Sequence, residues 1–245
     1  MEADFLKRVR IVLVDTSHPG NIGSAARAMK TMGITKLYLV NPDEFPSAKA
    51  TALASGADDL LGKAVLCSSV KEAVMDCRIV MGTSARLRSI PLPYCDVREA
   101  ATEMQQSDED DEIAILFGRE RYGLTNEQID YCQKLINVPT SKEYASLNLA
   151  QTVQLMTYEL RMAGLLGQHG KTLEIEEEKP ANVVHFEGFL DHHEHMLEEI
   201  GFVVPGQSTK MLQRIRRVFQ RARPSETEIN IFRGIVSRVL EKKDK

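Results

Sequence analysis

The chain has 245 residues, of which 43% are hydrophobic and 27% charged, a composition typical of a globular protein with a buried core. Its formal net charge of −4 argues against a protein that coats nucleic acid indiscriminately, so any RNA-binding site must be a local basic surface. No stretch approaches the roughly 18 apolar residues of a membrane span, and no apolar signal segment follows the acidic N-terminus. We therefore expect a cytoplasmic protein that has no membrane partner.

Strand-like and helix-like segments alternate along the first half of the chain. Strands are predicted at Val9–Asp15, Leu37–Val40, Val65–Cys67, Ile79–Gly82, Ile113–Phe117 and Leu135–Val138. Helices are predicted at Asn21–Met32, closed by Gly33, at Val70–Cys77 and at Ser146–Leu166. This alternation predicts an α/β fold, with a largely parallel sheet that is covered by helices on both faces.

The composition changes around residue 168. Residues 169–184 are acidic with little apolar content, which predicts a linker. Helices are predicted beyond it at Phe186–Ile200, Ser208–Ala222 and Ser225–Lys242, and Ser225 and Glu228 form a capping box at the start of the last one. We therefore predict an α/β domain at 1–168, an acidic linker at 169–184 and an all-helical extension at 185–245.

The cysteine and histidine patterns predict neither a disulfide nor a bound metal. Cys67, Cys77, Cys95 and Cys132 are far apart and form no CxxC pair, which favours reduced, buried thiols. His192 and His195 share a helix face, but no further cluster of ligands accompanies them. We interpret this histidine-rich stretch as a polar helix surface.

Segments that combine glycine, hydroxyl groups and arginine lie where the predicted strands end, and a segment with hydroxyl and amide groups lies where the long helix begins. They are residues 20–27 (GNIGSAAR), 82–86 (GTSAR, with Arg88 close behind), 117–124 (FGRERYGL) and 144–150 (YASLNLA). Ligands of open parallel sheets bind at the carboxyl ends of the strands. Gly20 and Gly23 would allow the backbone to approach a ligand or phosphate, although a plain strand-to-helix turn explains them more simply. Three strand ends with the same groups nevertheless indicate one shared site.

A dinucleotide-binding site is an alternative explanation of the first segment. Gly20-x-x-Gly23-x-x-Ala26 is close to the G-x-G-x-x-G fingerprint, and Asp43 follows the second strand. Ile22, however, stands where the fingerprint has its second glycine. An NAD-dependent oxidoreductase of the Rossmann type therefore stays open as a second hypothesis.

In this order, the segments resemble the motifs of the SPOUT superfamily of methyltransferases, in particular the TrmH-like branch that methylates ribose in tRNA and rRNA. Asn21-x-x-Gly23-x-x-Ala26-Arg27 is similar to the first motif, Phe117-Gly118-x-Glu120-x-x-Gly123-Leu124 to the second and Ser146-Leu147-Asn148-x-Ala150 to the third. The likeness extends over most of the chain and is weakest from about residue 170 to 205. It implies a homodimer whose α/β domain carries a C-terminal trefoil knot, which sequence patterns alone would not suggest.

The resemblance also implies that the chain transfers a methyl group from S-adenosylmethionine to a ribose 2′-hydroxyl of tRNA, at cytidine or uridine 32 of the anticodon loop. The residues implied to bind the cofactor are Thr83, Ser84, Ala85, Gly118, Val138, Ala145, Ser146, Leu147 and Asn148. Those implied in catalysis are Arg27, with Asn21, Glu120, Ser146 and Asn148 in support. The family assigns the base to the arginine, but a guanidinium is effectively always protonated. We therefore interpret Arg27 as a ligand of the phosphate beside the target ribose.

A basic surface for RNA is predicted in the helical extension. Lys210, Arg214, Arg217 and Arg221 recur at helical spacing on one face, and no acidic residue interrupts 210–223. With Arg27, Arg86 and Arg88, they are the residues that we predict to bind RNA. A protein with this fold that binds RNA without turning it over is the third hypothesis.

Overall fold

The computed structural model describes residues 4–85, 92–141, 143, 146–166, 178–204 and 209–243. The chain forms two compact units, Met1–Leu173 and Glu174–Lys245. The trefoil knot, the homodimer and the boundaries of the linker that were inferred from the sequence stay predictions.

The N-terminal unit contains a seven-stranded sheet in which all of the paired strands run parallel. The strands are β1 (Val9–Val14), β2 (Lys36–Val40), β3 (Val65–Cys67), β4 (Ile79–Thr83), β5 (Tyr94–Asp96), β6 (Ile113–Phe117) and β7 (Lys134–Asn137). Their order across the sheet is β3-β2-β1-β6-β4-β7-β5. The α/β class is confirmed, and the ends of the predicted strands differ from those observed by no more than about one residue, within the usual scatter of such assignments. Only β5 was not expected among these strands.

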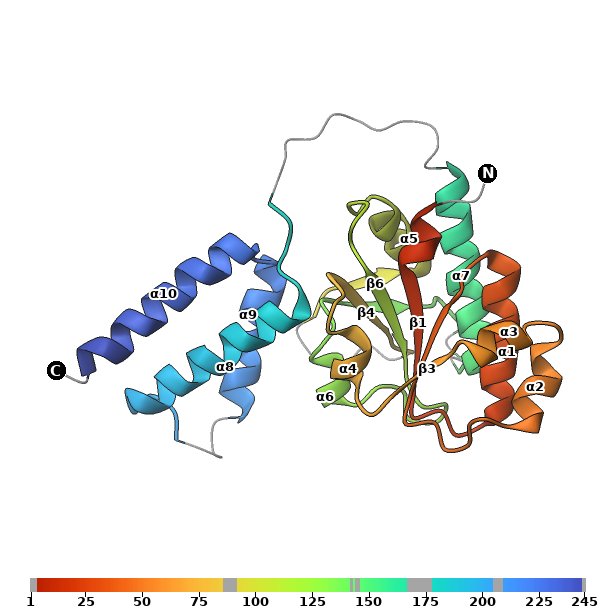
Figure 1. The fold of residues 1–245 in the computed structure, drawn as a ribbon, viewed down its shortest axis with the longest axis horizontal. Helices are drawn as coiled ribbons and strands as arrows, with labels where there is room; N and C mark the ends of the chain where they lie inside the picture. Colours follow the sequence, from red (N-terminus) through yellow and green to blue (C-terminus); the bar gives the residue numbers. More distant parts are fainter. Residues whose placement is uncertain are drawn as a thin grey trace. The chain divides into compact units, whose positions relative to one another are not determined.

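Helices cover both faces of this sheet (Figure 1). They are α1 (Pro19–Met32), α2 (Ala48–Ala54), α3 (Asp58–Gly62), α4 (Val70–Val74), α5 (Val97–Gln105), α6 (Asn126–Ile129) and α7 (Leu149–Leu166), and a 3-10 helix, η1 (Asp4–Arg8), precedes β1. The apolar sides of α1, α5 and α7 join those of β1 and β6 in the main core, whereas α4 and α6 lie on the opposite side of the sheet. Gly33 ends α1 in the left-handed conformation, at φ 83°, as the sequence predicted.

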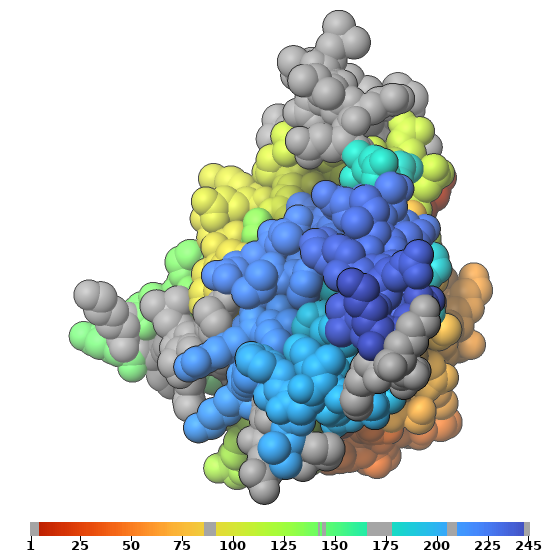
Figure 2. Space-filling view, turned by 90° about the vertical axis from the view of Figure 1, so that its left-hand side faces the viewer, coloured from red at the N-terminus to blue at the C-terminus, as the bar shows by residue number. Residues whose placement is uncertain are grey.

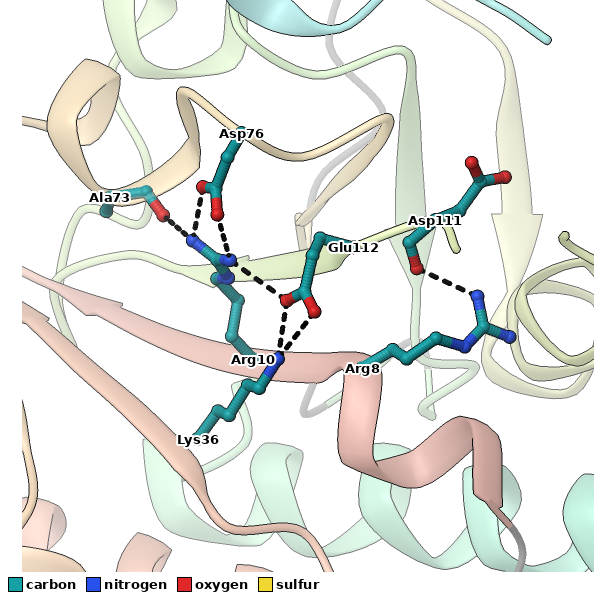
Figure 3. A network of polar contacts seen from close by, with 7 residues as sticks. All are labelled: Arg8, Arg10, Lys36, Ala73, Asp76, Asp111 and Glu112. Atoms are coloured by element: carbon teal, nitrogen blue, oxygen red, sulfur yellow. Dashed lines mark hydrogen bonds and ion pairs between the residues drawn. The ribbon is translucent and has the colours of Figure 1, made fainter. Parts of the chain in front are cut away.

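An ion network around the buried Arg10 joins the amino ends of the strands, at the edge of the sheet where no functional segment was expected (Figure 3). Arg10, the second residue of β1, is only 3% exposed. Its guanidinium donates to both carboxylate oxygens of Asp76, each at 2.8 Å, and to Glu112 at 3.0 Å. Lys36 at the start of β2 also binds Glu112, at 2.6 Å. The hydrogen bonds of Arg10 outweigh the cost of its burial and raise the pKa of this guanidinium, so it stays charged and links β1, β2, β4 and β6.

All of the longer elements in the described part of the C-terminal unit are helices. Its helices are α8 (Val183–Glu199), α9 (Thr209–Ala222) and α10 (Glu226–Lys243), and Figure 2 shows them as a light to dark blue surface. The rings of Phe189 (α8), Phe219 (α9) and Phe232 (α10) meet, with centroids 4.8 to 6.0 Å apart. The predicted capping box is confirmed, because Ser225 and Glu228 each bind the backbone N–H of the other.

Part of the segment that was assigned to the linker is folded onto the C-terminal unit. The backbone N–H of Ala181 donates to the carbonyl of Pro224 at 2.8 Å, and the Ser225 hydroxyl donates to Glu178 at 2.5 Å. Asn182 then caps α8, accepting a hydrogen bond from the backbone N–H of His185 at 3.0 Å. Residues 178–182 therefore connect the start of α8 with the start of α10.

All four cysteines are buried and free, as the sequence predicted. None of the helices in the described part of the chain is long and apolar enough to cross a membrane.

Candidate active site

A cavity of about 310 Å³ lies at the carboxyl ends of the central strands β4, β6 and β7. Pockets for small ligands begin at about this size. The predicted cofactor-binding residues among its lining are Thr83, Ser84, Ala85, Gly118, Val138, Ser146 and Leu147. Segments that are more than 60 positions apart in the sequence therefore form one pocket. Ala145, Arg86 and Arg88, which were also predicted to bind ligands, lie outside the described residues.

The loop after β4 is held between its two neighbouring strands. The Thr83 hydroxyl donates to the carbonyl of Leu116 on β6 at 3.1 Å. The backbone N–H of Ser84 donates to Ile136 on β7 at 2.9 Å, and the Ser84 carbonyl accepts from the Asn137 amide at 2.9 Å. These bonds fix the hydroxyls and peptide groups that face the cavity. Beside the apolar wall of Ile136, Val138, Leu147 and Leu149, they form a surface suited to a nucleoside.

A tight turn after β6 forms another wall, and Gly118 makes it possible. The backbone N–H of Gly123 donates to the carbonyl of Arg119 at 2.7 Å, which folds residues 119–123 back over Gly118. A methyl group on Gly118 would lie 2.2 Å from the backbone carbon of Gly123, closer than any real contact. Gly123 itself takes a positive φ of 68°, which glycine adopts without strain. The two glycines of this motif therefore set the shape of the turn.

Glu120, at the centre of this turn, is the hub of the site's hydrogen bonds. One carboxylate oxygen accepts from the Ser17 hydroxyl at 2.8 Å and from the Ser17 backbone N–H at 3.1 Å. The other accepts from the His18 backbone N–H at 3.2 Å and from the Asn21 amide at 2.9 Å. Burial by itself raises the pKa of Glu120, but the hydrogen bonds from Asn21 and Ser17 outweigh it and lower this pKa to about 2. Glu120 is therefore an anchored carboxylate and cannot act as a general base at neutral pH.

Asn21 and Asn148 extend this network from α1 to α7. The Asn148 amide donates to Asn21 Oδ1 at 2.9 Å, while Asn148 Oδ1 accepts from the backbone N–H of Ala150 at 2.9 Å. Asn148 is thus the N-cap of α7, which corrects the prediction that this helix begins at Ser146. The cap frees residue 146 to line the cavity. Three of the five predicted catalytic residues, Asn21, Glu120 and Asn148, form one chain of hydrogen bonds.

Gly20 and Gly23 of the first segment allow two helices to pack closely, whereas one interpretation of the sequence was that they let the backbone approach a ligand or phosphate. A methyl group on Gly23 would lie 2.0 Å from the carbonyl oxygen of Ala50 on α2, and one on Gly20 would lie 2.8 Å from the Leu53 side chain. Neither glycine is among the described residues that line the cavity. They allow α1 and α2 to pack closely, so the interpretation that they admit a ligand is wrong for this cavity.

Arg27 lies two turns along α1, on the outside of the unit. Its side chain is exposed, and it is not among the described residues that line the cavity of its own chain. It lies six positions after Asn21, about 9 Å further along the helix axis. The described part of the chain therefore brings Asn21, Glu120 and Asn148 together, whereas Arg27 stands apart from them.

The basic face of α9 is observed only in part. Lys210, Arg214 and Arg221 are exposed, as predicted, but Arg217 is buried, with 9% of its surface exposed. Helical spacing assigns these four residues to one side of the helix, but it does not reveal which of them tertiary packing covers. The prediction that Arg217 belongs to the exposed basic face is therefore wrong.

The histidine-rich stretch of α8 packs in part against aromatic rings. His193 lies 5.8 Å from the Phe189 ring and 6.0 Å from the Phe219 ring, and its burial lowers the pKa of the imidazole. No cluster of three or more His, Cys, Asp or Glu side chains that could hold a metal occurs among the described residues.

Sequence reasoning missed several residues of the site. Ser17 and His18 hold Glu120 through their backbone N–H groups, and a backbone contact leaves no trace in the residue type. Arg121 and Tyr122 line the cavity beside Glu120. Both residues lie within the second motif, but charged residues between glycines, such as Arg121, are typical of an ordinary exposed turn.

Comparisons with known proteins agree with this geometry. Residues 8–158 match the SpoU rRNA Methylase family, and residues 185–245 match the C-terminal domain of the tRNA methyltransferase TrmJ. A curated protein of Pectobacterium atrosepticum, named tRNA (cytidine/uridine-2'-O-)-methyltransferase TrmJ, is 46% identical over 239 residues, which are 98% of this chain and 99% of that protein.

Two solved structures also resemble the chain. The crystal structure of TrmJ from Z. mobilis ZM4 matches with a TM-score of 0.83 and 34% identity, covering 94% of this chain and 98% of that one. A probable methylase family protein from Haemophilus influenzae matches with a TM-score of 0.65 and 41% identity, covering 98% of both chains. The architecture described above is therefore shared over nearly the whole length.

Proposed function

The chain belongs to the SpoU rRNA Methylase family, and from this premise we propose that it methylates a ribose 2′-hydroxyl of tRNA with S-adenosylmethionine as the methyl donor. The observation that carries the proposal is the hydrogen-bonded chain of Asn148, Asn21 and Glu120 at the border of a nucleoside-sized cavity. These residues come from all three motifs, so the motifs act as one site. The TrmJ relatives support tRNA, at cytidine or uridine, as the substrate.

The cavity residues fit the proposed cofactor. Ile136, Val138 and Leu147 offer an apolar surface to the adenine, and the Thr83–Ala85 loop offers hydroxyls and peptide groups to the ribose. When bound, S-adenosylmethionine supplies a methyl group activated by a positively charged sulfur. The chain's own task is to hold the ribose oxygen in line with that methyl group, at roughly 3 to 3.5 Å.

The Glu120 network supplies this rigidity. Because the carboxylate is bound by four donors from Ser17, His18 and Asn21, it fixes the turn after β6 against the start of α1. The same network sets the start of α7 through Asn148. Its members act by positioning the walls of the site, since a carboxylate whose pKa is about 2 is too weak a base to take the proton of the ribose hydroxyl.

We assign to Arg27 the binding of the phosphate next to the target ribose. A guanidinium offers two parallel hydrogen bonds to phosphate and stabilises charge on the ribose oxygen as its proton leaves. Arg27→Lys should therefore retain part of the methyl-transfer rate, by preserving the charge, whereas Arg27→Ala should lose nearly all of it. Equal loss in both variants, with unchanged cofactor affinity measured by calorimetry, would contradict a role based on charge.

The exposed position of Arg27 away from its own cavity supports a homodimer in which Arg27 of one subunit serves the cavity of the other. A mixture of Arg27→Ala and Val138→Trp chains, unfolded and refolded together, tests this arrangement. Random pairing of two inactive variants should restore about a quarter of the wild-type activity, since half of the dimers contain one intact site. No recovery would place Arg27 in the site of its own subunit.

The tRNA is proposed to contact the exposed basic face of α9, defined by Lys210, Arg214 and Arg221. Reversing Arg214 and Arg221 to glutamate should raise the KM for tRNA and flatten its dependence on salt, because each lost phosphate contact removes released counterions. Arg98→Glu is a suitable control, since Arg98 is exposed on α5 of the other unit. An unchanged salt slope in the α9 variant would place the tRNA elsewhere.

The position of the methyl group is the direct test of function. We propose nucleotide 32 of the anticodon loop as the target, in a cytoplasmic reaction. Unmodified tRNA incubated with the protein and labelled S-adenosylmethionine should gain a methyl group that protects one phosphodiester bond from alkaline cleavage, because the neighbouring 2′-oxygen is blocked. A methyl group on a base would refute ribose methylation. RNA binding without any transfer would favour the non-catalytic hypothesis.

A further inference from the structure

An aromatic ring stands free at the edge of the cavity. Tyr122 is 75% exposed, the highest value among the large hydrophobic side chains in the described part of the chain. It nevertheless lines the cavity, two residues from Glu120. A ring in this position contributes little to the core, and its place beside the site makes it available to bind a ligand.

The turn that carries Tyr122 is held on several sides, so the ring is presented from a fixed base. Arg119 pairs with Asp43 at 2.6 Å, and Glu120 accepts the hydrogen bonds from the start of α1. The backbone of Gly123 closes the turn onto Arg119 and leaves no room for a side chain on Gly118. A preorganised aromatic residue can bind a flat ligand at a low cost in conformational entropy.

Positive charge lies on the same turn. Arg121 is exposed, lines the cavity next to Tyr122 and forms no ion pair with another of the described residues. A flat ring beside a free guanidinium is the combination that binds single-stranded nucleic acid, in which bases stack on aromatic side chains and cations contact the backbone. Tyrosine and arginine are also enriched at protein interfaces, so the oligomeric state of a Tyr122 variant must distinguish RNA from a second copy of the chain.

We propose that Tyr122 stacks on an unpaired base of the RNA next to the target ribose and that Arg121 contacts the adjoining phosphate. The inference rests on the proposed function and deepens it, because it requires the target to lie in a loop where bases are unstacked. A fully paired RNA would offer no base to Tyr122.

A fluorescence titration tests the contact without relying on activity. The chain has no tryptophan, so Tyr122→Trp introduces a single fluorescent reporter at the tip of the turn. Adding an anticodon stem-loop RNA should cause a saturable loss of its fluorescence, and a fully paired duplex of the same length should not. Met75→Trp is the control, since Met75 is partly exposed near Asp76, at the amino ends of the strands and opposite the cavity. Equal responses in the two variants, or no response in Tyr122→Trp, would overturn the inference.

Steady-state kinetics provides the second test. Tyr122→Ala should raise the KM for tRNA by about 5-fold or more, the loss expected for one base-stacking contact, and Tyr122→Phe should stay within about 2-fold of the wild type because it keeps the ring. The affinity for S-adenosylmethionine, measured by calorimetry, should be unchanged in both variants. A lower cofactor affinity in Tyr122→Ala, or a changed oligomeric state in ultracentrifugation, would assign the ring to the cofactor or to a second copy instead.

The two proposals fail in distinguishable ways. If the wild-type chain transfers no methyl group to tRNA, the proposed function is wrong, and the fluorescence titration still decides whether Tyr122 meets RNA. If the wild type methylates tRNA and Tyr122→Ala retains its KM, only the inference on Tyr122 is wrong.

Discussion

Replacing Glu120 with glutamine should loosen the site without changing its size. Both carboxylate oxygens of Glu120 accept hydrogen bonds, one from Ser17 and the other from His18 and Asn21. A glutamine can turn only one oxygen toward these donors, so its amide group must face N–H groups that it cannot satisfy. We expect the turn after β6 to separate from α1, with a lower kcat and a lower free energy of unfolding.

The size of this effect follows from the proton affinity of the carboxylate. The pKa of Glu120 falls from its ordinary value of 4.5 to about 2, and a tenfold change in proton affinity corresponds to about 1.4 kcal/mol. Between pH 5 and pH 3 the unfolded chain takes up the proton and the folded chain does not, so stability falls by at most about 2 kcal/mol. Because water partly screens the carboxylate, we expect about 1 kcal/mol.

Urea denaturation of both proteins at pH 5 and pH 3, followed by circular dichroism, measures this quantity. The wild type should be the more stable protein at pH 5, and its advantage over Glu120→Gln should shrink by about 1 kcal/mol at pH 3. The identical C-terminal unit cancels in the difference. An advantage that is the same at both pH values would refute the statement that Glu120 is held as a carboxylate by these donors.

Three further substitutions probe the geometry around the site. Gly118→Ala places a methyl group 2.2 Å from the backbone of Gly123 and should weaken cofactor binding in calorimetry by about 10-fold or more. Gly23→Ala forces α2 away from α1, because the new methyl group meets the Ala50 carbonyl, and should cost about 1–3 kcal/mol in thermal unfolding. Arg10→Ala removes a buried side chain and the cation of two partly exposed carboxylates, and should cost about 1–3 kcal/mol, with an unchanged KM for tRNA.

Controls separate these effects from general damage. Arg98→Ala removes an ion pair whose arginine side chain is 79% exposed, and should change the thermal stability by less than about 1 kcal/mol. Gly62→Ala meets no atom within 4 Å and should bind the cofactor as the wild type does. A loss in Gly62→Ala equal to that in Gly118→Ala would contradict the steric argument, and a raised KM in Arg10→Ala would contradict the distance of the ion network from the site.

The sequence revealed the elements that carry strong local patterns. Apart from Arg10, the β1 strand consists of apolar, mostly β-branched residues and is buried on both faces. Gly33 and Ser225 mark helix ends that the structure keeps. By contrast, α2 and β5 are short and owe their conformation to partners, because α2 packs on the glycines of α1 and β5 pairs with β7. Local propensity cannot predict elements of this kind.

The sequence predicted which residues form the site but not the hydrogen bonds that join them. The motifs pointed to Asn21, Glu120 and Asn148, yet only the strand order, with β6 beside β1, explains why Glu120 meets the start of α1. The sequence also placed the start of the long helix at Ser146, whereas the bond that Asn148 Oδ1 accepts from the backbone of Ala150 places its cap at Asn148. The burial of Arg217 depends on tertiary contacts that helical spacing does not contain.

Equilibrium binding of S-adenosylmethionine tests the central claim, that the cavity at the carboxyl ends of β4, β6 and β7 is the cofactor site. Calorimetry should find one saturable site per chain in the wild type, no saturable binding of NAD, and loss of the S-adenosylmethionine site in Val138→Trp, whose indole would fill the cavity. Saturable NAD binding without S-adenosylmethionine binding, or an unchanged affinity in Val138→Trp, would contradict the account.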